Sequence, residues 1–281
     1  MLDSNHYGFY EGSVWYRAHY TAAQDGGTLK FQGNGGSGQP GHGKAPAFMQ
    51  VWVNGEYAGS PRAAGGWQDV AIPAGAVTAG EEVVVSVLAH NLGQNLDWSD
   101  DGLSRQNRGL YDAVLTNGDG SVTWKIEGAT TAEADPVRTM YNNGGLAGES
   151  NGWHLPEFDD GKWDAAASLV ADEPGVSWYR SSFALDVPKG QDTAFRLTLN
   201  SPKFEAGRTD GSQATIFVNG WNTGVYIGDI GPQKQFTIPS GFLNMRGDNE
   251  IAIAVAAKAA GMGPESVTLD AVHSTTGGVG R

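Results

Sequence analysis

The sequence predicts an all-β protein made of two tandem β-sandwiches of the jelly-roll kind. Three observations support this: short alternating apolar segments between turn residues, an internal repeat along the chain, and the composition. Glycine accounts for 42 of the 281 residues, tryptophan for 9, and charged residues for only 17%. A helical bundle would need periodic runs of Ala, Glu, Lys and Leu instead.

The internal repeat divides the chain into two halves. Blocks of the first half recur in the second half in the same order and at nearly constant spacing. The repeated pairs are residues 12–17 and 175–180, 53–55 and 218–220, 72–73 and 238–239, and 82–87 and 250–255. We therefore predict a first sandwich over residues 1–130, with a closing strand near 121–128, and a second over 131–281.

Several of these blocks read as strands. Apolar and polar, or bulky and small, side chains alternate along residues 48–53, 122–126, 195–199 and 251–255. Asn54-Gly55, which follows the first of them, is a hairpin-type turn. Only residues 162–173 could form a helix, and that helix would be short.

The second copy opens with a segment that the first copy lacks. Residues 152–163 precede Trp178, whereas the 14 residues ahead of Trp15 contain nothing similar. A sandwich without its first strand would expose an unpaired edge. We therefore expect the first unit to be truncated at its N-terminus, with the missing strand lying upstream of Met1.

Specific motifs carry a resemblance to a known family. Trp153-His154-Leu155-Pro156, Phe158-Asp159-Asp160-Gly161-Lys162-Trp163 and the Trp178-Tyr179-Arg180 block resemble the galactose-binding-like jelly roll of many glycosidases. A narrower resemblance is to the C-terminal domains of large, fungal-type β-galactosidases of glycoside hydrolase family 35. Four stretches carry it: residues 226–233, 90–98, 108–110 and 143–146. The resemblance covers nearly the whole chain.

That resemblance implies a parent protein with a catalytic (β/α)₈ barrel followed by β-sandwich domains. The family's barrel acts on terminal β-galactosyl residues with retention, using two glutamates, and no motif here matches them. A barrel needs about 250 residues, so it cannot share this length with two jelly rolls. We expect the chain itself not to be an enzyme and its partner to be the missing barrel of the parent.

Charge and cysteine content limit the remaining options. A net charge of −13 argues against nucleic acid and against an anionic membrane surface as partners. The absence of cysteine excludes disulfides and thiolate metal sites. It suits a cytosolic protein and a secreted bacterial one equally, so the compartment stays open and a secreted parent is one option.

Other chemistry finds weaker support. Carboxylates such as Asp97, Asp100 and Asp159 lie in turn-like contexts, where Asp bonds to the local backbone. The Gly-rich residues 33–38 lack the helix that a dinucleotide fold requires. No residues are assigned to a metal or cofactor, although the acidic stretch 97–101 leaves a structural calcium ion open without matching the EF-hand pattern.

Carbohydrate binding is the sharper functional candidate. A sugar site usually presents an aromatic face beside amide, carboxylate or guanidinium groups, and the loop 91–108 offers that mixture. Trp15, Trp52, Trp163 and Trp178 lie in repeat blocks or strands and are expected in the core. The candidate carbohydrate-binding residues are Asn95, Asp97, Trp98, Arg105, Asn107 and, after the second Asn-Gly turn, Trp221.

Two functions remain. The first is a non-catalytic part of a β-galactosidase that buttresses the catalytic barrel, with weak binding of β-galactosides. The alternative is a stand-alone pair of lectin-like modules.

Overall fold

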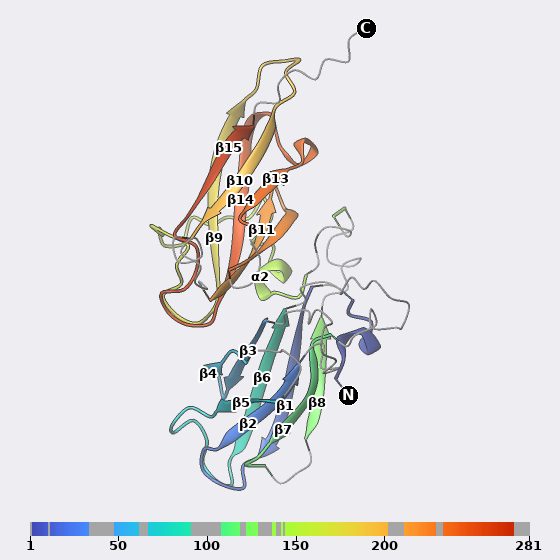
Figure 1. Ribbon diagram of the computed structural model, residues 1–281, viewed down its shortest axis with the longest axis vertical. Coiled ribbons are helices and arrows are strands. Elements are labelled where there is room, and N and C mark those ends of the chain that lie inside the picture. Colours follow the sequence, from blue (N-terminus) through green and yellow to red (C-terminus); the bar gives the residue numbers. More distant parts are fainter. Residues whose placement is uncertain are drawn as a thin grey trace. The chain divides into compact units, whose positions relative to one another are not determined.

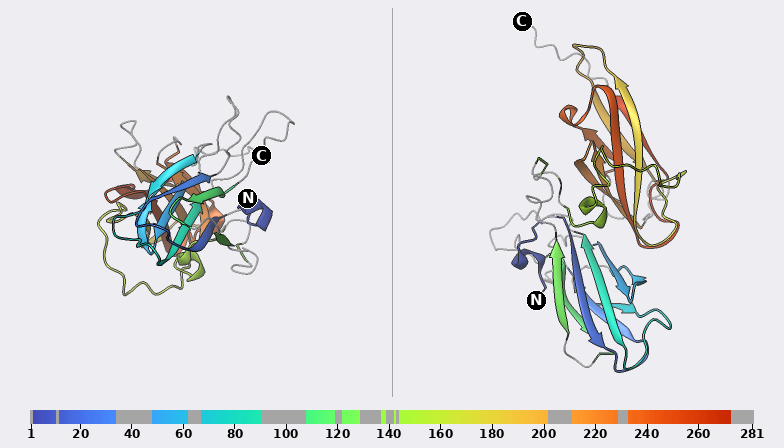
Figure 2. Two further views of the ribbon diagram at one scale, coloured as in Figure 1. Left: turned by 90° about the horizontal axis from the view of Figure 1, so that it is seen from below. Right: turned by 180° about the vertical axis from the view of Figure 1, so that it is seen from behind.

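The computed structural model describes residues 2–10, 12–33, 48–61, 67–90, 108–118, 122–128, 137–138, 142, 144–201, 211–228 and 233–272. The chain forms two compact units, unit 1 (residues 1–146) and unit 2 (residues 147–281). Each is a two-layered sandwich of antiparallel strands (Figures 1 and 2). The predicted boundary was 130/131. Unit 1 extends further because the Ser13 backbone N–H donates to the Gly144 carbonyl at 3.0 Å, which attaches this stretch to the first strand.

Unit 1 pairs a larger sheet with a smaller one. A short 3-10 helix, η1 (Ser4–Tyr7), precedes the first strand. The five-stranded sheet has the order β4 (Glu56–Gly59), β3 (Phe48–Val53), β6 (Glu82–His90), β1 (Ser13–Thr21) and β8 (Thr123–Gly128). The three-stranded sheet has the order β5 (Trp67–Ala71), β2 (Thr28–Gly33) and β7 (Leu110–Leu115).

Unit 2 repeats the order of β1–β7 in its strands β9–β15, and β8 of unit 1 has no counterpart in it. Helix α2 (Ala147–Ser150) opens the unit, and η3 (Ser240–Phe242) connects two of its strands. The four-stranded sheet has the order β12 (Trp221–Ile227), β11 (Ser212–Val218), β14 (Arg246–Ala257) and β9 (Gly175–Asp186). The three-stranded sheet has the order β13 (Gln235–Ile238), β10 (Ala194–Asn200) and β15 (Ser266–Val272). The predicted all-β fold with two tandem sandwiches is confirmed.

The Asn-Gly turns occupy the same place in both copies. Asn54 and Gly55 have φ values of 51° and 87°, and Asn219 and Gly220 have φ values of 48° and 81°. Two successive positive φ angles define the type I′ turn, whose twist matches that of the flanking strands. The turns therefore fix the β3–β4 and β11–β12 hairpins, as the sequence predicts.

The structure corrects the sequence alignment of the two copies by two residues. The Asn54 backbone N–H donates to the Val84 carbonyl, and the Val84 N–H donates to Asn54 Oδ1, both at 2.8 Å. Asn219 makes the same two bonds with Glu250, also at 2.8 Å. Glu250 therefore corresponds to Val84 and not to Glu82. A slip of two residues keeps every side chain on its face, so the pattern alone could not reveal it.

Each unit has its own apolar core between its two sheets. In unit 1 the core includes Tyr16 and Phe31, both fully buried. In unit 2 it includes Tyr226 and Ile253. Because the two cores are separate, each copy contains the packing that a domain needs.

The tryptophans expected in the core lie outside both of these cores. Trp15 and Trp52 are half-buried on the outer face of the five-stranded sheet. Trp178 and Trp163 are half-buried on the outer side of the unit 2 sheet. The prediction was wrong because both faces of β1 are apolar around Trp15, so alternation does not identify the inner one.

Two further expectations differ from the structure. Residues 162–173 form turns and bends instead of a helix, and the whole stretch 151–174 between α2 and β9 contains no strand. Strand β1 is paired on both sides, with β6 and with β8. Residues 152–163, which have no counterpart in the sequence of unit 1, therefore form no edge strand, and β1 is not left unpaired on either side.

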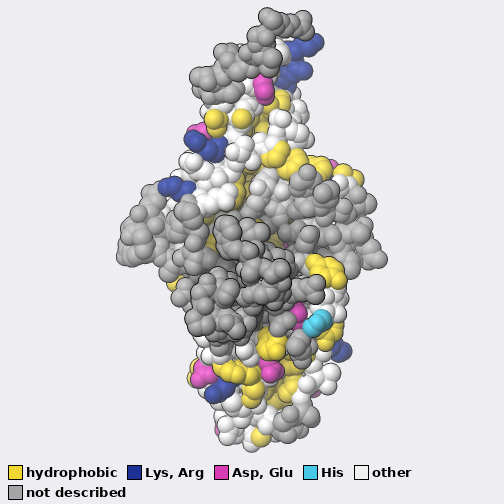
Figure 3. Space-filling model, turned by 45° about the vertical axis from the view of Figure 1, so that its right-hand side comes forward, with side chains coloured by type: hydrophobic (Ala, Val, Ile, Leu, Met, Phe, Trp, Pro, Cys, Tyr) yellow, Lys and Arg dark blue, Asp and Glu magenta, His cyan; other side chains and the backbone are white. Residues whose placement is uncertain are grey.

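Hydrophobic side chains also reach the surface of unit 1. The exposed ones include Tyr7, Tyr10, Trp67 and Val114. Figure 3 shows hydrophobic side chains interspersed with charged ones on the described surface of this half.

Within the described part of the chain, no helix has the length and apolarity needed to span a bilayer.

Candidate functional site

Of the sugar-binding residues predicted from the sequence, only Trp221 lies among the described residues. The structure does not describe the other five, which are Asn95, Asp97, Trp98, Arg105 and Asn107. Trp221 begins β12 and is half-buried, with its indole stacked on the Phe242 ring at 4.7 Å and 8°. One face of this indole is therefore covered, and at most the other could meet a sugar ring.

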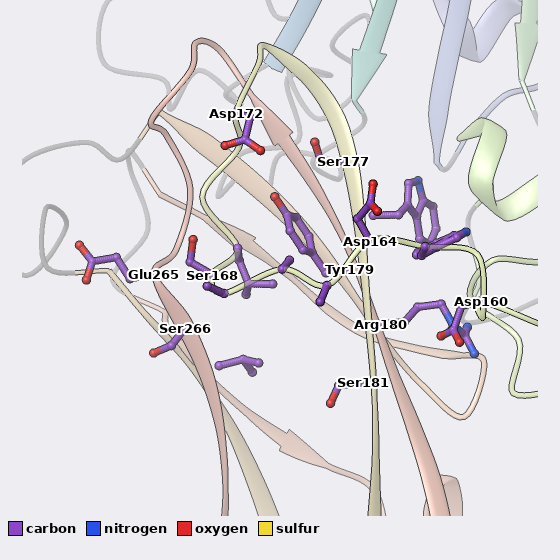
Figure 4. A pocket seen from close by; sticks show the side chains of 17 residues that line it. Asp160, Asp164, Ser168, Asp172, Ser177, Tyr179, Arg180, Ser181, Glu265 and Ser266 are labelled. Atoms are coloured by element: carbon purple, nitrogen blue, oxygen red, sulfur yellow. The ribbon is translucent and has the colours of Figure 1, made fainter.

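A cavity of about 720 Å³ lies in unit 2, beside β9. One wall is the segment between α2 and β9, a second is β9 from Ser177 to Ser181, and a third is the start of β15 (Figure 4). Its volume lies within the range of small-molecule sites. Aromatic and acidic groups line it together, including Trp163, Tyr179, Asp160, Asp164, Asp172 and Glu265.

Arg180 is the polar centre of this region. Its side chain is only 2% exposed, although it projects from a strand on the outer side of the sheet. Its Nε donates to Asp160 Oδ2 at 2.9 Å, and its Nη1 donates to the carbonyl oxygens of Trp153 and, at 3.1 Å, Leu155. A planar guanidinium can satisfy several acceptors at once, which a lysine could not do in this geometry. Arg180 thus fastens the segment ahead of β9 to the sheet.

A second carboxylate faces the same guanidinium. Glu250 Oε2 on β14 lies 3.6 Å from Arg180 Nη2. Burial raises the pKa of Glu250 above its usual value, the Arg180 charge opposes that rise, and the nearby Asp160 and Asp248 add to it. A buried cation between two carboxylates is a common structural ion-pair arrangement.

An aromatic cluster surrounds this fastening point. The Trp153 ring lies 5.5 Å from Trp163 and 5.9 Å from Trp178, edge-on in both cases. Phe158 packs on Trp163 at 5.6 Å, and the Arg180 guanidinium lies 5.5 Å from the Phe158 ring centre. These aromatic contacts add to the apolar burial and hold residues 153–163 on the sheet.

Unit 1 brings together three polar residues that the sequence analysis did not link. Ser13 Oγ lies 3.1 Å from His90 Nδ1, and His90 Nε2 lies 3.2 Å from Gln50 Oε1. All three are buried. Burial lowers the pKa of His90 to about 3, so the imidazole is neutral at physiological pH. No local pattern could have linked them, because the three residues come from the separate strands β1, β3 and β6.

The cavity does not provide the carboxylate pair that glycoside hydrolysis requires. A retaining site holds two carboxyl groups about 5–5.5 Å apart beside the sugar. Here Asp160 is bonded to Arg180. The other carboxylates, Asp164, Asp172 and Glu265, lie along different parts of the cavity and do not point toward one another (Figure 4).

The described residues contain no group of three or more His, Cys, Asp or Glu side chains suited to a metal ion. The acidic stretch 97–101, considered for calcium, lies outside the described residues.

Comparison with known proteins identifies the family. The model of the "Beta-galactosidase second all-beta domain" matches residues 1–95 and 148–260, one stretch in each unit. The chain belongs to this family.

Curated relatives of this second all-beta domain family are fungal β-galactosidases. A probable beta-galactosidase A of Aspergillus phoenicis and the beta-galactosidase A of Aspergillus niger are each 33% identical over 277 residues. Each alignment covers 95% of this chain and 26% of the relative. A Penicillium beta-galactosidase A is 30% identical over 268 residues, 90% of this chain and 25% of that protein. The chain thus spans about a quarter of the length of these relatives.

Solved structures add little to this family assignment. The apo form of a Pleurotus ostreatus lectin is 13% identical, with 94% of this chain and 77% of the lectin covered, at a TM-score of 0.22. A likeness of that size supports no structural inference.

Proposed function

We propose that the chain is a non-catalytic β-sandwich region of a β-galactosidase and that it buttresses the catalytic barrel of its parent protein. The supporting observation is the comparison with known proteins. The chain aligns with 26% of the length of relatives that carry the β-galactosidase name. Catalysis, with retention and two glutamates as the family resemblance implies, belongs to the barrel.

The arrangement of the cavity favours this reading over a catalytic role for the chain. Asp160 and Glu250 are both committed to Arg180. Asp160 attaches the segment ahead of β9 to the sheet through Arg180, and Glu250 pairs with the same guanidinium from β14 of the sheet itself. A scaffold needs such internal attachments and needs no reactive site.

Two measurements test the proposal. The isolated chain should release no more chromophore from a chromogenic β-galactoside than a heat-inactivated sample does. In the parent enzyme, deletion of this region should shorten the half-life of thermal inactivation while KM changes little. Hydrolysis by the isolated chain, or a parent whose inactivation rate is unaffected by the deletion, would contradict the proposal.

The unit 2 cavity favours a second candidate function, weak galactoside binding. Its wall combines the Trp163 indole with the carboxylates of Asp172 and Glu265, groups that recognise sugar rings and hydroxyls. At about 0.3 kcal/mol per heavy atom, a monosaccharide of about 12 such atoms gains about 4 kcal/mol, which corresponds to millimolar affinity. Such binding would act mainly by concentrating substrate near a linked catalytic domain.

NMR titration with galactose, lactose and galactan distinguishes the two candidates. Binding at the cavity would shift the signals of residues 164–172 and 265–267, and Glu265→Gln would weaken it. Binding at the loop predicted from the sequence would be lost in Trp98→Ala. Flat titrations with all three sugars would leave the scaffold function alone.

A further inference from the structure

The outer faces of the two larger sheets carry the same recognition groups. The repeat places Trp15 and Arg17 of β1 where β9 carries Trp178 and Arg180, and Trp52 of β3 where β11 carries Phe217. The aromatic pair is preserved in space: the Trp15 and Trp52 rings lie 5.6 Å apart, and the Trp178 and Phe217 rings lie 5.7 Å apart.

In unit 2 a polypeptide segment covers this face. Trp153 packs on Trp178, His154 lies 5.0 Å from the Phe217 ring, and the backbone of α2 touches Trp178 at Gly148. The covering segment, residues 147–169, brings aromatic side chains, main-chain carbonyls and an aspartate. Arg180 binds two of those carbonyls and the aspartate, and is almost fully buried as a result.

In unit 1 the equivalent groups lack such a cover among the described residues. Arg17 is exposed, and its guanidinium makes no hydrogen bond or ion pair with another described residue. Trp52 extends the aromatic row to Tyr57 at 5.7 Å. A hollow of about 620 Å³ lies over Trp15, Arg17, His19, Ser86, Lys125 and Glu127.

The charge on this face suits an acidic occupant. Arg17 and Lys125 are directly opposite each other in the β1–β8 pairing, and both are exposed. Like charges that face each other across strands destabilise the sheet, and an aspartate placed between them would relieve that repulsion.

We propose that the outer face formed by Trp15, Arg17, Trp52 and Tyr57 is a docking surface for a polypeptide segment with the chemistry of residues 153–163. That segment places aromatic rings on Trp15 and Trp52 and presents carbonyl oxygens and an aspartate to Arg17. The proposal rests on the repeat and on the contacts within unit 2, and does not depend on the β-galactosidase function.

The test is an NMR titration of the whole chain with a synthetic peptide of residues 150–166, followed through the indole N–H signals of Trp15 and Trp52. The peptide should shift both signals at sub-millimolar to millimolar concentration. Arg17→Gln should weaken its affinity about tenfold, the loss expected for a charge-assisted hydrogen-bonding group. Lys30→Gln, an exposed lysine on the other sheet of unit 1, is the matched control and should leave the affinity unchanged.

Several results would overturn the proposal. These are an absence of shifts at millimolar peptide, shifts confined to other regions, or equal binding by a peptide with Trp153 and Trp163 replaced by alanine. Shifts of Trp15 and Trp52 with galactose but not with peptide would make the face a sugar platform instead. Dilution-sensitive shifts without peptide would make it a contact between two copies of the chain.

Discussion

Arg180 and Arg17 occupy equivalent positions in the two copies and have opposite surroundings. Arg180 is 2% exposed and bonded to Asp160 and two carbonyls, whereas Arg17 is exposed. Arg180→Gln would leave buried acceptors unpaired and should lower the stability of unit 2 by about 2–4 kcal/mol. The loss should stay below that of a fully buried ion pair because Asp160 is 43% exposed and solvent stabilises it when Arg180 is removed.

Urea unfolding of Arg180→Gln and Arg17→Gln side by side checks this prediction. Arg17→Gln should change stability by less than about 0.5 kcal/mol, as most surface substitutions do. Equal losses in the two variants would mean that Arg180 does not fasten the covering segment.

His90 predicts a pH dependence for unit 1. Its pKa is about 3 in the folded protein because of burial, whereas an unfolded histidine has a pKa of about 6.5. Below that unfolded value the unfolded state takes up a proton that the folded state does not. Unit 1 should therefore lose up to about 1.4 kcal/mol of stability per pH unit as pH falls from about 6.5 toward 3.

The comparison of His90→Gln with the unchanged chain isolates this effect from that of the carboxylates. The difference in unfolding free energy between the two proteins should grow in favour of the variant as pH falls from 7 to 4. A difference that is constant over this range would mean that His90 is protonated in the fold.

At the scale of elements, the covering segment depends on a close backbone approach. A Cβ at Gly148 in α2 would lie 2.2 Å from a Trp178 ring atom and 2.6 Å from Trp153. Gly148→Ala should therefore push α2 off the sheet and cost about 1–3 kcal/mol through overpacking. Gly241→Ala, where a Cβ would meet nothing within 4 Å, is the control. Thermal unfolding followed by tryptophan fluorescence measures both, and equal Tm values would contradict the account.

The sequence predicted elements wherever a local signal was strong. The Asn-Gly turns, the strands around residues 48–53 and 251–255 and the duplication all follow from alternation, turn chemistry and self-similarity. It failed where both faces of a strand are apolar, as at Val14, Trp15 and Tyr16, because alternation then does not identify the inner face.

The candidate site was harder to predict than the fold. Arg180, Asp160 and Glu250 come from three separate elements, and only the folded register brings them together. Trp163 and the aspartates beside it were visible as a motif. The structure shows that they cover a sheet and do not pair as a strand, because residues 151–174 form turns and bends.

At the scale of the whole molecule, the chain consists of two copies of one sandwich that fold separately. Each unit has its own core and its own pair of sheets, and separate cores make separate folding units. The covering segment, residues 147–169, lies wholly within unit 2, so a division of the chain after Leu146 removes none of these contacts.

Separate expression of residues 1–146 and 147–281 tests this claim most directly, with circular dichroism and urea unfolding as the measurements. We expect both pieces to show β-sheet spectra and to unfold cooperatively. The second piece should lose that cooperative transition when its first residues, 147–169, are also deleted. Two pieces that fold only when mixed would contradict the account.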